Sequence, residues 1–252
     1  MEQETTLTDH LIELRRRLLW SFVAMGIGTL ICYVFAAQIY GFLVQPLAQA
    51  MGEDSSQRLI YTSLTEPFFT YLKVAFFAGM FLTAPILLTQ IWLFIAPGLY
   101  RQERGAVWPF LTATPILFFL GGATVYYAVM PVAWHFFLSF ESDGAETTLP
   151  IQLEAKVSEY LDLVMTLIFA FGLCFQLPVL LTLLGRAGLI TRRFLVEKRK
   201  YMIVLTLIIA AFLTPPDIIS QVMLAIPMVV LYELSILLVP AEKPLEPATE
   251  AP

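Results

Sequence analysis

The stretch FLTPPDIISQVML, residues 212–224, interrupts an apolar run of 39 residues, Tyr201–Val239, that carries two charges. A continuous helix of this length would measure about 58 Å, roughly twice the hydrocarbon thickness of a bilayer. The TPPD segment at 214–217 ends a helix, because proline lacks an N–H and pushes the preceding residue out of the α region, and its aspartate can cap the next helix. The run therefore predicts a hairpin of two membrane helices, at 201–213 and 218–239.

The rest of the chain is similarly apolar. Its 252 residues are 58% hydrophobic and 14% charged, with a mean hydropathy of +0.77, more than a soluble domain of this length can bury. Four further uncharged runs reach the roughly 18 residues that span a bilayer: 18–37, 74–96, 107–130 and 163–184. Prolines inside them predict kinks: Pro85, Pro109, Pro115 and Pro178. We therefore expect an all-α polytopic membrane protein with six transmembrane helices in one domain, residues 1–240.

Two of the predicted helices have informative lengths. The first arm of the hairpin, 201–213, gives about 20 Å of helix against roughly 30 Å of hydrocarbon, so the membrane should be locally thin beside it. The first run, 18–37, is longer than the roughly 7 to 15 apolar residues of a cleavable signal peptide. We expect it to remain as a membrane anchor.

Lysine and arginine are distributed unevenly between the two sides of these helices. One side receives most of them: Arg15, Arg16, Arg17, Arg101, Arg104 and six more between Arg186 and Lys200. The other side receives only Arg58, Lys73 and Lys156. The positive-inside rule places the first side in the cytoplasm, together with both termini. Residues 241–252 are Pro-rich and acidic without apolar periodicity, which predicts a disordered cytoplasmic tail.

The sequence contains no recognisable catalytic apparatus. It has no GxxxxGK[ST] loop, no GxSxG elbow, no HExxH and no CxxC, and the topology places His10 and His135 on opposite sides of the membrane. Cys32 and Cys174 lie in uncharged runs, which favours small apolar packing residues. No basic arm for nucleic acid is found outside the segments that flank apolar runs. We therefore predict a protein that is not an enzyme and that needs no metal or cofactor.

A few polar residues occupy informative positions. Glu13 precedes Arg17 by four residues, the spacing of an exposed ion pair on one helical face. Within the apolar runs, polar groups are costly unless they face the bundle interior or a partner, and these are Gln90, Gln176, Gln221 and Glu233. For each glutamine, a hydrogen bond between helices of the same bundle remains an equal alternative to a functional role.

Several motifs together resemble one known family: HLIELRRRL (10–18), EPFF (66–69), APILLTQIWLFIAPGLYRQER (84–104), LTPPDIISQ (213–221) and LAIPM (224–228). This is the TatC family of the twin-arginine protein translocase, and the similarity covers nearly the whole chain. It implies a cup-like bundle of six helices, the fifth and sixth short, in the bacterial cytoplasmic (inner) membrane. It also implies a receptor for twin-arginine signal peptides that helps to export folded proteins with the proton-motive force.

The resemblance further implies partners and a peptide site. The partners are single-span proteins of the TatA and TatB type, in a hetero-oligomer with several copies in the lipid bilayer. Glu13 and Glu103 match the acids that receive the arginine pair, and a guanidinium fork suits a carboxylate. The surface around them is shaped by neighbouring motif residues: Leu14, Arg15, Phe94, Tyr100 and Arg104. Pro46 and Glu66 match the family's outer region, where we expect cap-like packing.

The hairpin suggests a second site, for partner helices beside the thin part of the bundle. Gln221 can present its amide at membrane depth, and the other candidate docking residues are Thr214, Asp217, Gln176 and Glu233. Alternatively, Gln221 bonds within its own bundle, for example to Thr214. Gln176 stands where many family members have glutamate, so a role that needs a titratable carboxylate there is in doubt. A secondary transporter of a small solute is the main alternative function, although no inverted repeat is found.

Overall fold

The computed structural model describes residues 7–52, 58–99, 107–142, 149, 153–213 and 218–240. Its secondary structure is helical, and the one β contact among these residues is an isolated bridge between Ile60 and Lys156. The helices are α1 (Leu7–Val34), α2 (Ala36–Met51), α3 (Glu66–Leu99), α4 (Val107–Thr124), the π-helical segment η2 (Val125–Val129), α5 (Met130–Leu138), α6 (Val157–Cys174), α7 (Leu177–Arg186), α8 (Arg192–Leu213) and α9 (Ile218–Leu238).

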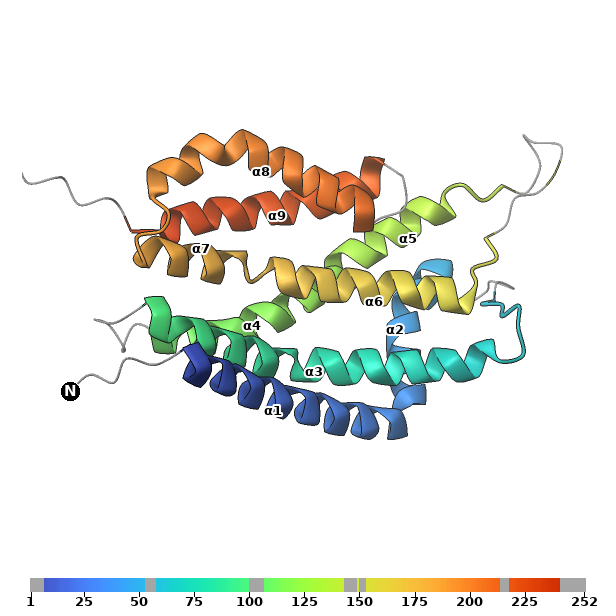
Figure 1. Ribbon diagram of the computed structural model, residues 1–252. Helices are drawn as coiled ribbons and strands as arrows, with labels where there is room; N and C mark the ends of the chain where they lie inside the picture. Colours follow the sequence, from blue (N-terminus) through green and yellow to red (C-terminus); the bar gives the residue numbers. More distant parts are fainter. Residues whose placement is uncertain are drawn as a thin grey trace, which may run out of the picture.

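The long helices lie side by side, and α2 crosses them at one end (Figure 1). Five helical segments of the described chain are long and apolar enough to cross a membrane: Ile12–Val34, Glu66–Leu93, Pro109–Leu138, Val157–Arg186 and Gln221–Leu238. The expected all-α membrane fold is therefore confirmed. The sixth predicted span, 201–213, is the apolar part of α8, whose first nine residues carry all six of its charges.

The predicted third and fourth runs are both irregular helices. In the fourth run, α6 ends at Cys174 and α7 begins at Leu177, with Pro178 in the first turn of α7, so the kink predicted there is confirmed. In the third run, α4 leads through η2 into α5, so the helix continues past its predicted end at residue 130. Pro131 lies two residues after the end of η2, and a π turn is a usual way to accommodate an irregularity inside a helix.

Close packing of α1 against α3 fixes the position of the N-terminal helix. A Cβ atom added at Gly79 of α3 would lie 2.5 Å from the backbone nitrogen of Thr29 in α1, and one added at Gly28 would lie 2.9 Å from Thr83. Membrane helices associate mainly through such close contact, because lipid tails are as apolar as their side chains. Glycine at these positions therefore holds the two helices in register.

The hairpin of α8 and α9 forms one side of the bundle. Figure 1 shows that the C-terminal end of α8 and the start of α9 stop short of the ends of α3 and α6. At the other end, where α1 begins, Arg192–Lys200 of α8 lie near the end of α9 (Figure 1). We call this the basic end of the bundle, because it also carries Arg15, Arg16 and Arg17.

Candidate functional site

An acidic side chain lies among the arginines of the basic end. Glu13 is on α1, one turn before Arg17, and its carboxylate Oε1 accepts hydrogen bonds from Arg17 Nε at 3.0 Å and Nη2 at 2.5 Å. The ion pair predicted from the spacing of the two residues is therefore confirmed. The side chain of Glu13 is 45% exposed and that of Arg17 is 23% exposed, so the carboxylate remains accessible.

Arg17 also connects this acid to α3. Its Nη1 donates to Oε1 of Gln90 at 3.3 Å, across the interface that Gly28 and Gly79 bring close. Gln90, which interrupts the apolar run of α3, thus has a hydrogen-bond partner inside the bundle. This was one of the two alternatives predicted for it. One guanidinium therefore binds groups on both helices and fixes the position of Glu13 relative to α3.

The polar residues of the hairpin also have partners within the chain. Gln221 Nε2 donates to the backbone carbonyl of Leu207 in α8 at 3.0 Å, so the amide bonds inside the bundle. Glu233 accepts a hydrogen bond from Arg199 Nη2 at 2.7 Å, and both side chains are about half-exposed. Thr214 and Asp217 lie outside the described residues.

Gln176 lies at the turn between α6 and α7 and is 6% exposed. Its Nε2 donates to the carbonyl of Thr114 in α4 at 3.0 Å, and its Oε1 is buried without a hydrogen bond in the described part of the chain. An ionised glutamate has no proton to donate to that carbonyl. The amide therefore supplies a bond between α4 and the α6–α7 break that a carboxylate could supply only when protonated.

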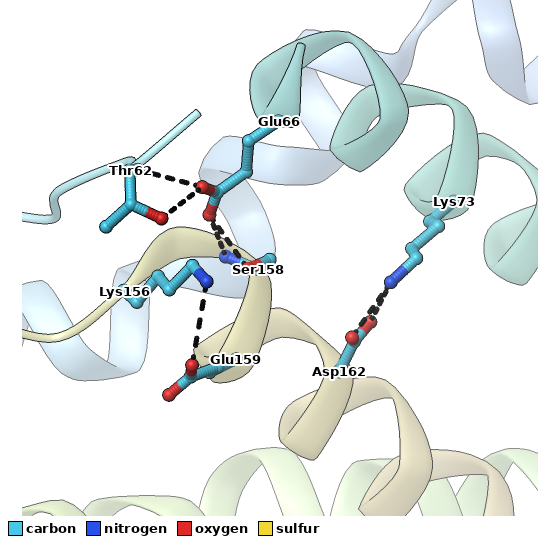
Figure 2. A network of polar contacts seen from close by, with 7 residues as sticks. All are labelled: Thr62, Glu66, Lys73, Lys156, Ser158, Glu159 and Asp162. Carbon is cyan, nitrogen blue, oxygen red and sulfur yellow. Dashed lines mark hydrogen bonds and ion pairs between the residues drawn. The ribbon is translucent and has the colours of Figure 1, made fainter. Parts of the chain in front are cut away.

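At the opposite end of the bundle, Glu66 joins α3 to α6 (Figure 2). One oxygen of its carboxylate accepts hydrogen bonds from the N–H and hydroxyl of Thr62, at 2.9 and 3.3 Å. The other accepts from the N–H and hydroxyl of Ser158, at 3.3 and 2.8 Å. A single carboxylate thus ties the segment before α3 to the first turn of α6, beside the bridge between Ile60 and Lys156.

A second pair marks the boundary of the apolar part at this end. Lys73 Nζ lies 2.9 Å from Oδ2 of Asp162, and both side chains are about half-exposed (Figure 2). The uncharged run of α3 begins after Lys73, so Glu66 lies about two turns outside it. Its hydrogen bonds, first from the Thr62 N–H and then from the Ser158 hydroxyl, lower the pKa of the Glu66 carboxyl from its usual 4.5 to about 2.

Comparison with known proteins shows to which family this helical bundle belongs. The sequence profile of the Sec-independent protein translocase protein TatC matches residues 9–227. The chain is 52% identical to the protein of that name from Magnetococcus marinus over 94% of its own length and 84% of the relative's. It is 38% identical to the one from Escherichia coli K12, over 94% and 88%. The chain belongs to the TatC family.

The three-dimensional comparison agrees with this assignment. A crystal structure of the twin arginine translocase receptor TatC in DDM superposes with a TM-score of 0.80 at 37% identity, covering 92% of this chain and 99% of that one. As a member of the TatC family, the protein is a component of a protein translocase, which is a transport role. The transporter alternative is not favoured.

The peptide-site residues implied by the TatC resemblance are only partly described. Leu14 and Arg15 are exposed beside Glu13 on α1. Phe94 lies in α3, one turn after Gln90, but its side chain is outside the described part. Tyr100, Glu103 and Arg104 follow the end of α3 and also lie outside the described residues.

Sequence reasoning missed two tyrosines that hold α2. Pro46 is buried inside α2 and has no N–H for the carbonyl of Phe42, four residues earlier. The hydroxyl of Tyr126 in η2 donates to that carbonyl at 2.8 Å, and the hydroxyl of Tyr160 in α6 donates to the neighbouring carbonyl of Leu43 at 2.9 Å. The proline inside an apolar helix was the available signal, since it predicts a free carbonyl that needs a donor.

Proposed function

We propose that the protein is the signal-peptide receptor of a twin-arginine translocase, which exports folded proteins across the bacterial inner membrane with the proton-motive force. Membership of the TatC family supports the general function. The observation that carries the specific role is Glu13, an accessible carboxylate held at the basic end of the bundle by Arg17. A surface rich in arginine repels a cationic peptide unless acids such as this one receive it.

The proposed site takes one arginine of the peptide at Glu13 and the other at Glu103. A guanidinium presents a planar fork of donors that matches a carboxylate. The contact of Arg17 with Gln90 supports the pairing of the two acids, because it ties α1 to the helix that leads toward Glu103. The neighbouring motif residues shape the same surface: Leu14, Arg15, Phe94, Tyr100 and Arg104.

Binding of a synthetic signal peptide to membranes that contain the assembled translocase tests this site. Glu13→Gln and Glu103→Gln should each weaken binding by about tenfold to a hundredfold, the effect of losing one charge-assisted hydrogen-bonded pair. Glu197→Gln is a matched control, because Glu197 pairs with Arg193 at 3.0 Å in α8 at the same end of the bundle. If both variants, singly and together, bind the peptide like the parent, the assignment is wrong.

The second part of the proposal concerns single-span partner proteins of the TatA and TatB type. Their helices would pack beside the short α8–α9 hairpin, where Nε2 of Gln221 is bound to Leu207 and no hydrogen bond to its Oε1 is found among the described residues. An interhelical hydrogen bond there is typically worth about 0.6 kcal/mol, enough to fix register but not to hold a complex. The other candidate docking residues are Thr214, Asp217, Gln176 and Glu233.

Crosslinking tests this docking site. Gln221→Leu should reduce crosslinks from positions 218–224 to a partner helix while leaving peptide binding at Glu13 intact. Unchanged crosslinking in a folded Gln221→Leu protein would return this residue to a structural role, as a donor to Leu207 alone.

The proposed orientation places the basic end and both termini in the cytoplasm, as the positive-inside rule predicts. A membrane-impermeant thiol probe at a cysteine introduced near Pro252 should react only after the cells are opened. Reaction in intact cells would place the C-terminus outside and contradict the even number of spans.

A further inference from the structure

The first half of α8 carries two lysines that lack an acidic partner within the described chain. At the opposite end of the bundle, Lys73 and Lys156 each have a carboxylate partner, at 2.9 and 3.7 Å. Lys198 and Lys200 have no carboxylate within ion-pair distance among the described residues. The two ammonium groups therefore leave their charge available to an anion.

The two acids of the α8–α9 hairpin are already bound by arginines. Glu197 accepts a hydrogen bond from Arg193 at 3.0 Å, and Glu233 accepts one from Arg199 at 2.7 Å. Together the two helices carry five cations and two acids, so three positive charges remain in excess. This excess lies at the start of α8, where Lys198 and Lys200 are exposed.

Aromatic rings hold both lysines at the surface of α8. Lys198 Nζ lies 5.1 Å from the ring centre of Tyr201 and 5.6 Å from that of Phe194. Lys200 Nζ lies 5.2 Å from the ring centre of Tyr201. An aromatic ring attracts a cation within about 6 Å through its negative face. The rings thus restrict two long side chains without using their N–H donors, of which an ammonium has three.

The same side of α8 continues as an exposed apolar surface. Residues at alternating spacings of three and four lie on one side of a helix. This outer face of α8 consists of Phe194, Lys198, Tyr201, Leu205, Ile208 and Phe212. Its five apolar or aromatic members are between 46% and 88% exposed, whereas Leu195, Thr206 and Ala210 on the side toward the bundle are buried. Figure 1 shows α8 at the edge of the bundle, packed on α9.

The position of the lysines along the helix matches the position of a lipid phosphate. Tyr201 begins the uncharged part of α8, and tyrosine is enriched where hydrocarbon meets the headgroups. From Tyr201 to Phe212 the helix measures about 16 Å, close to half of the roughly 30 Å hydrocarbon core. The outer face therefore offers cations at headgroup level and apolar side chains over the depth of one leaflet.

We propose that the outer face of α8 binds an anionic phospholipid, with its phosphate at Lys198 and Lys200 and an acyl chain along Leu205, Ile208 and Phe212. Lysine binds phosphate as a point charge, and basic residues beside a membrane helix attract anionic lipids. A zwitterionic lipid is disfavoured, because its own cation is repelled by the excess positive charge. Tyr201 is a positioning residue, since it acts through the two ammonium groups. The inference goes beyond the proposed function and does not depend on peptide binding.

Photolabelling tests the site. The full chain is reconstituted in phosphatidylcholine vesicles with a trace of lipid that carries a photoreactive acyl chain, either phosphatidylglycerol or phosphatidylcholine. The measured quantity is the ratio of phosphatidylglycerol label to phosphatidylcholine label on residues 201–212. This ratio should be about twentyfold in the parent, because each lysine near the headgroups contributes about fivefold. A parent ratio of one would overturn the inference.

Variants of the two lysines give the expected dependence on charge. Lys198→Gln should lower the ratio by about fivefold, and a further Lys200→Gln should bring it close to one. Lys198→Arg keeps the charge and the ring contacts, so its ratio should stay within about twofold of the parent. Tyr201→Leu should lower the ratio by about threefold and Tyr201→Phe should not, because phenylalanine retains the ring. Equal ratios in Tyr201→Leu and the parent would contradict the positioning role.

The chain provides a matched control in Arg16→Gln. Arg16 is exposed at the same end of the bundle but on α1. This variant removes one cation without touching α8, so the ratio should stay within about twofold of the parent. A fall as large as that in Lys198→Gln would show a general attraction of anionic lipid to the basic end and overturn the inference.

Two further measurements exclude other occupants of the outer face. Inorganic phosphate should lower the ratio no more than sodium chloride of equal ionic strength, because it has no acyl chain to place on the apolar residues. A loss of the ratio specific to phosphate would show that the lysines bind a soluble anion. Vesicles that contain the assembled translocase should give the same labelling as the chain alone. If labelling of residues 201–212 is lost only there, a partner helix covers this face and the lipid site is wrong.

Discussion

The hydroxyl of Tyr126 donates to the carbonyl of Phe42 at 2.8 Å, and the two rings stack with their centroids 4.3 Å apart. This carbonyl is the one that Pro46 leaves without a helical N–H. A proline that would otherwise weaken α2 therefore becomes an attachment point for η2. The same contact explains how α2, which crosses the long helices, is held at a defined depth.

Tyr126→Phe should lower the free energy of unfolding in detergent micelles by about 1 to 3 kcal/mol, because the Phe42 carbonyl loses its donor while ring stacking remains. In a Pro46→Ala background, an alanine N–H at position 46 can satisfy the carbonyl, so the same substitution should cost less. Equal costs in both backgrounds, measured as a double-mutant cycle, would contradict this account.

Glu66 should make stability depend on pH at the end of the bundle opposite the basic end. Its folded-state pKa of about 2 lies below the unfolded value, so its contribution is fully present above about pH 4.5 and is lost as the pH falls toward 2. Glu66→Gln should be less stable than the parent at pH 7, and the difference should shrink between about pH 4.5 and 2. The ion pair of Lys73 and Asp162 is present in both proteins and cancels in the comparison. A difference that is constant from pH 7 to 3 would show that Glu66 does not titrate in this way.

Features with a local cause could be predicted from the sequence. The TPPD segment at 214–217 correctly indicated the end of one helix and the start of another, because proline acts on its own backbone and its neighbour's. Pro178 likewise indicated the break between α6 and α7. The spacing of Glu13 and Arg17 was sufficient for their ion pair, because residues four apart share a helical face.

Features that depend on which helices pack together could not be predicted. Gln90 binds Arg17 from 73 positions away, and Tyr160 binds the carbonyl of Leu43 from 117 positions away. Apolar periodicity does not identify neighbours in a membrane, because a face toward lipid and a face toward protein have similar composition. The partners of the intramembrane polar residues therefore became known only from the structure.

Gln176→Glu should destabilise the bundle in a pH-dependent way. The ionised side chain has no proton for the carbonyl of Thr114 and would be buried, whereas the protonated form can donate as the amide does. The loss of stability should therefore grow as the pH rises from 5 to 8. Gln176→Leu is the control, with a loss of about 1 kcal/mol that does not vary with pH. Thermal unfolding in micelles across this pH range distinguishes the two patterns, and parallel curves would argue against the role of the amide proton.

The pair of Arg199 and Glu233 should contribute modestly to the hairpin. The two side chains join α8 to α9 but are 47% and 44% exposed, and solvent weakens such pairs. A double-mutant cycle with Arg199→Gln and Glu233→Gln should give a coupling free energy of about 0.5 kcal/mol, and less at high salt. A coupling well above 2 kcal/mol would show that the pair is shielded from water.

Gly79→Ala tests whether the close packing of α1 and α3 positions the peptide site. The added Cβ would lie 2.5 Å from the backbone nitrogen of Thr29, and backbone cannot move aside as a flexible side chain can, so the helices must separate. Separation lengthens the contact between Arg17 and Gln90, which is already 3.3 Å, and releases Glu13 from its fixed position relative to α3. We expect weaker binding of the signal peptide, by about tenfold, together with a lower unfolding temperature. Gly26→Ala in α1 is the matched control, because no atom lies within 4 Å of a Cβ there, and it should change neither quantity. Normal peptide binding by a destabilised Gly79→Ala protein would mean that the α1–α3 interface serves the fold alone and that Glu13 functions without its connection to Gln90.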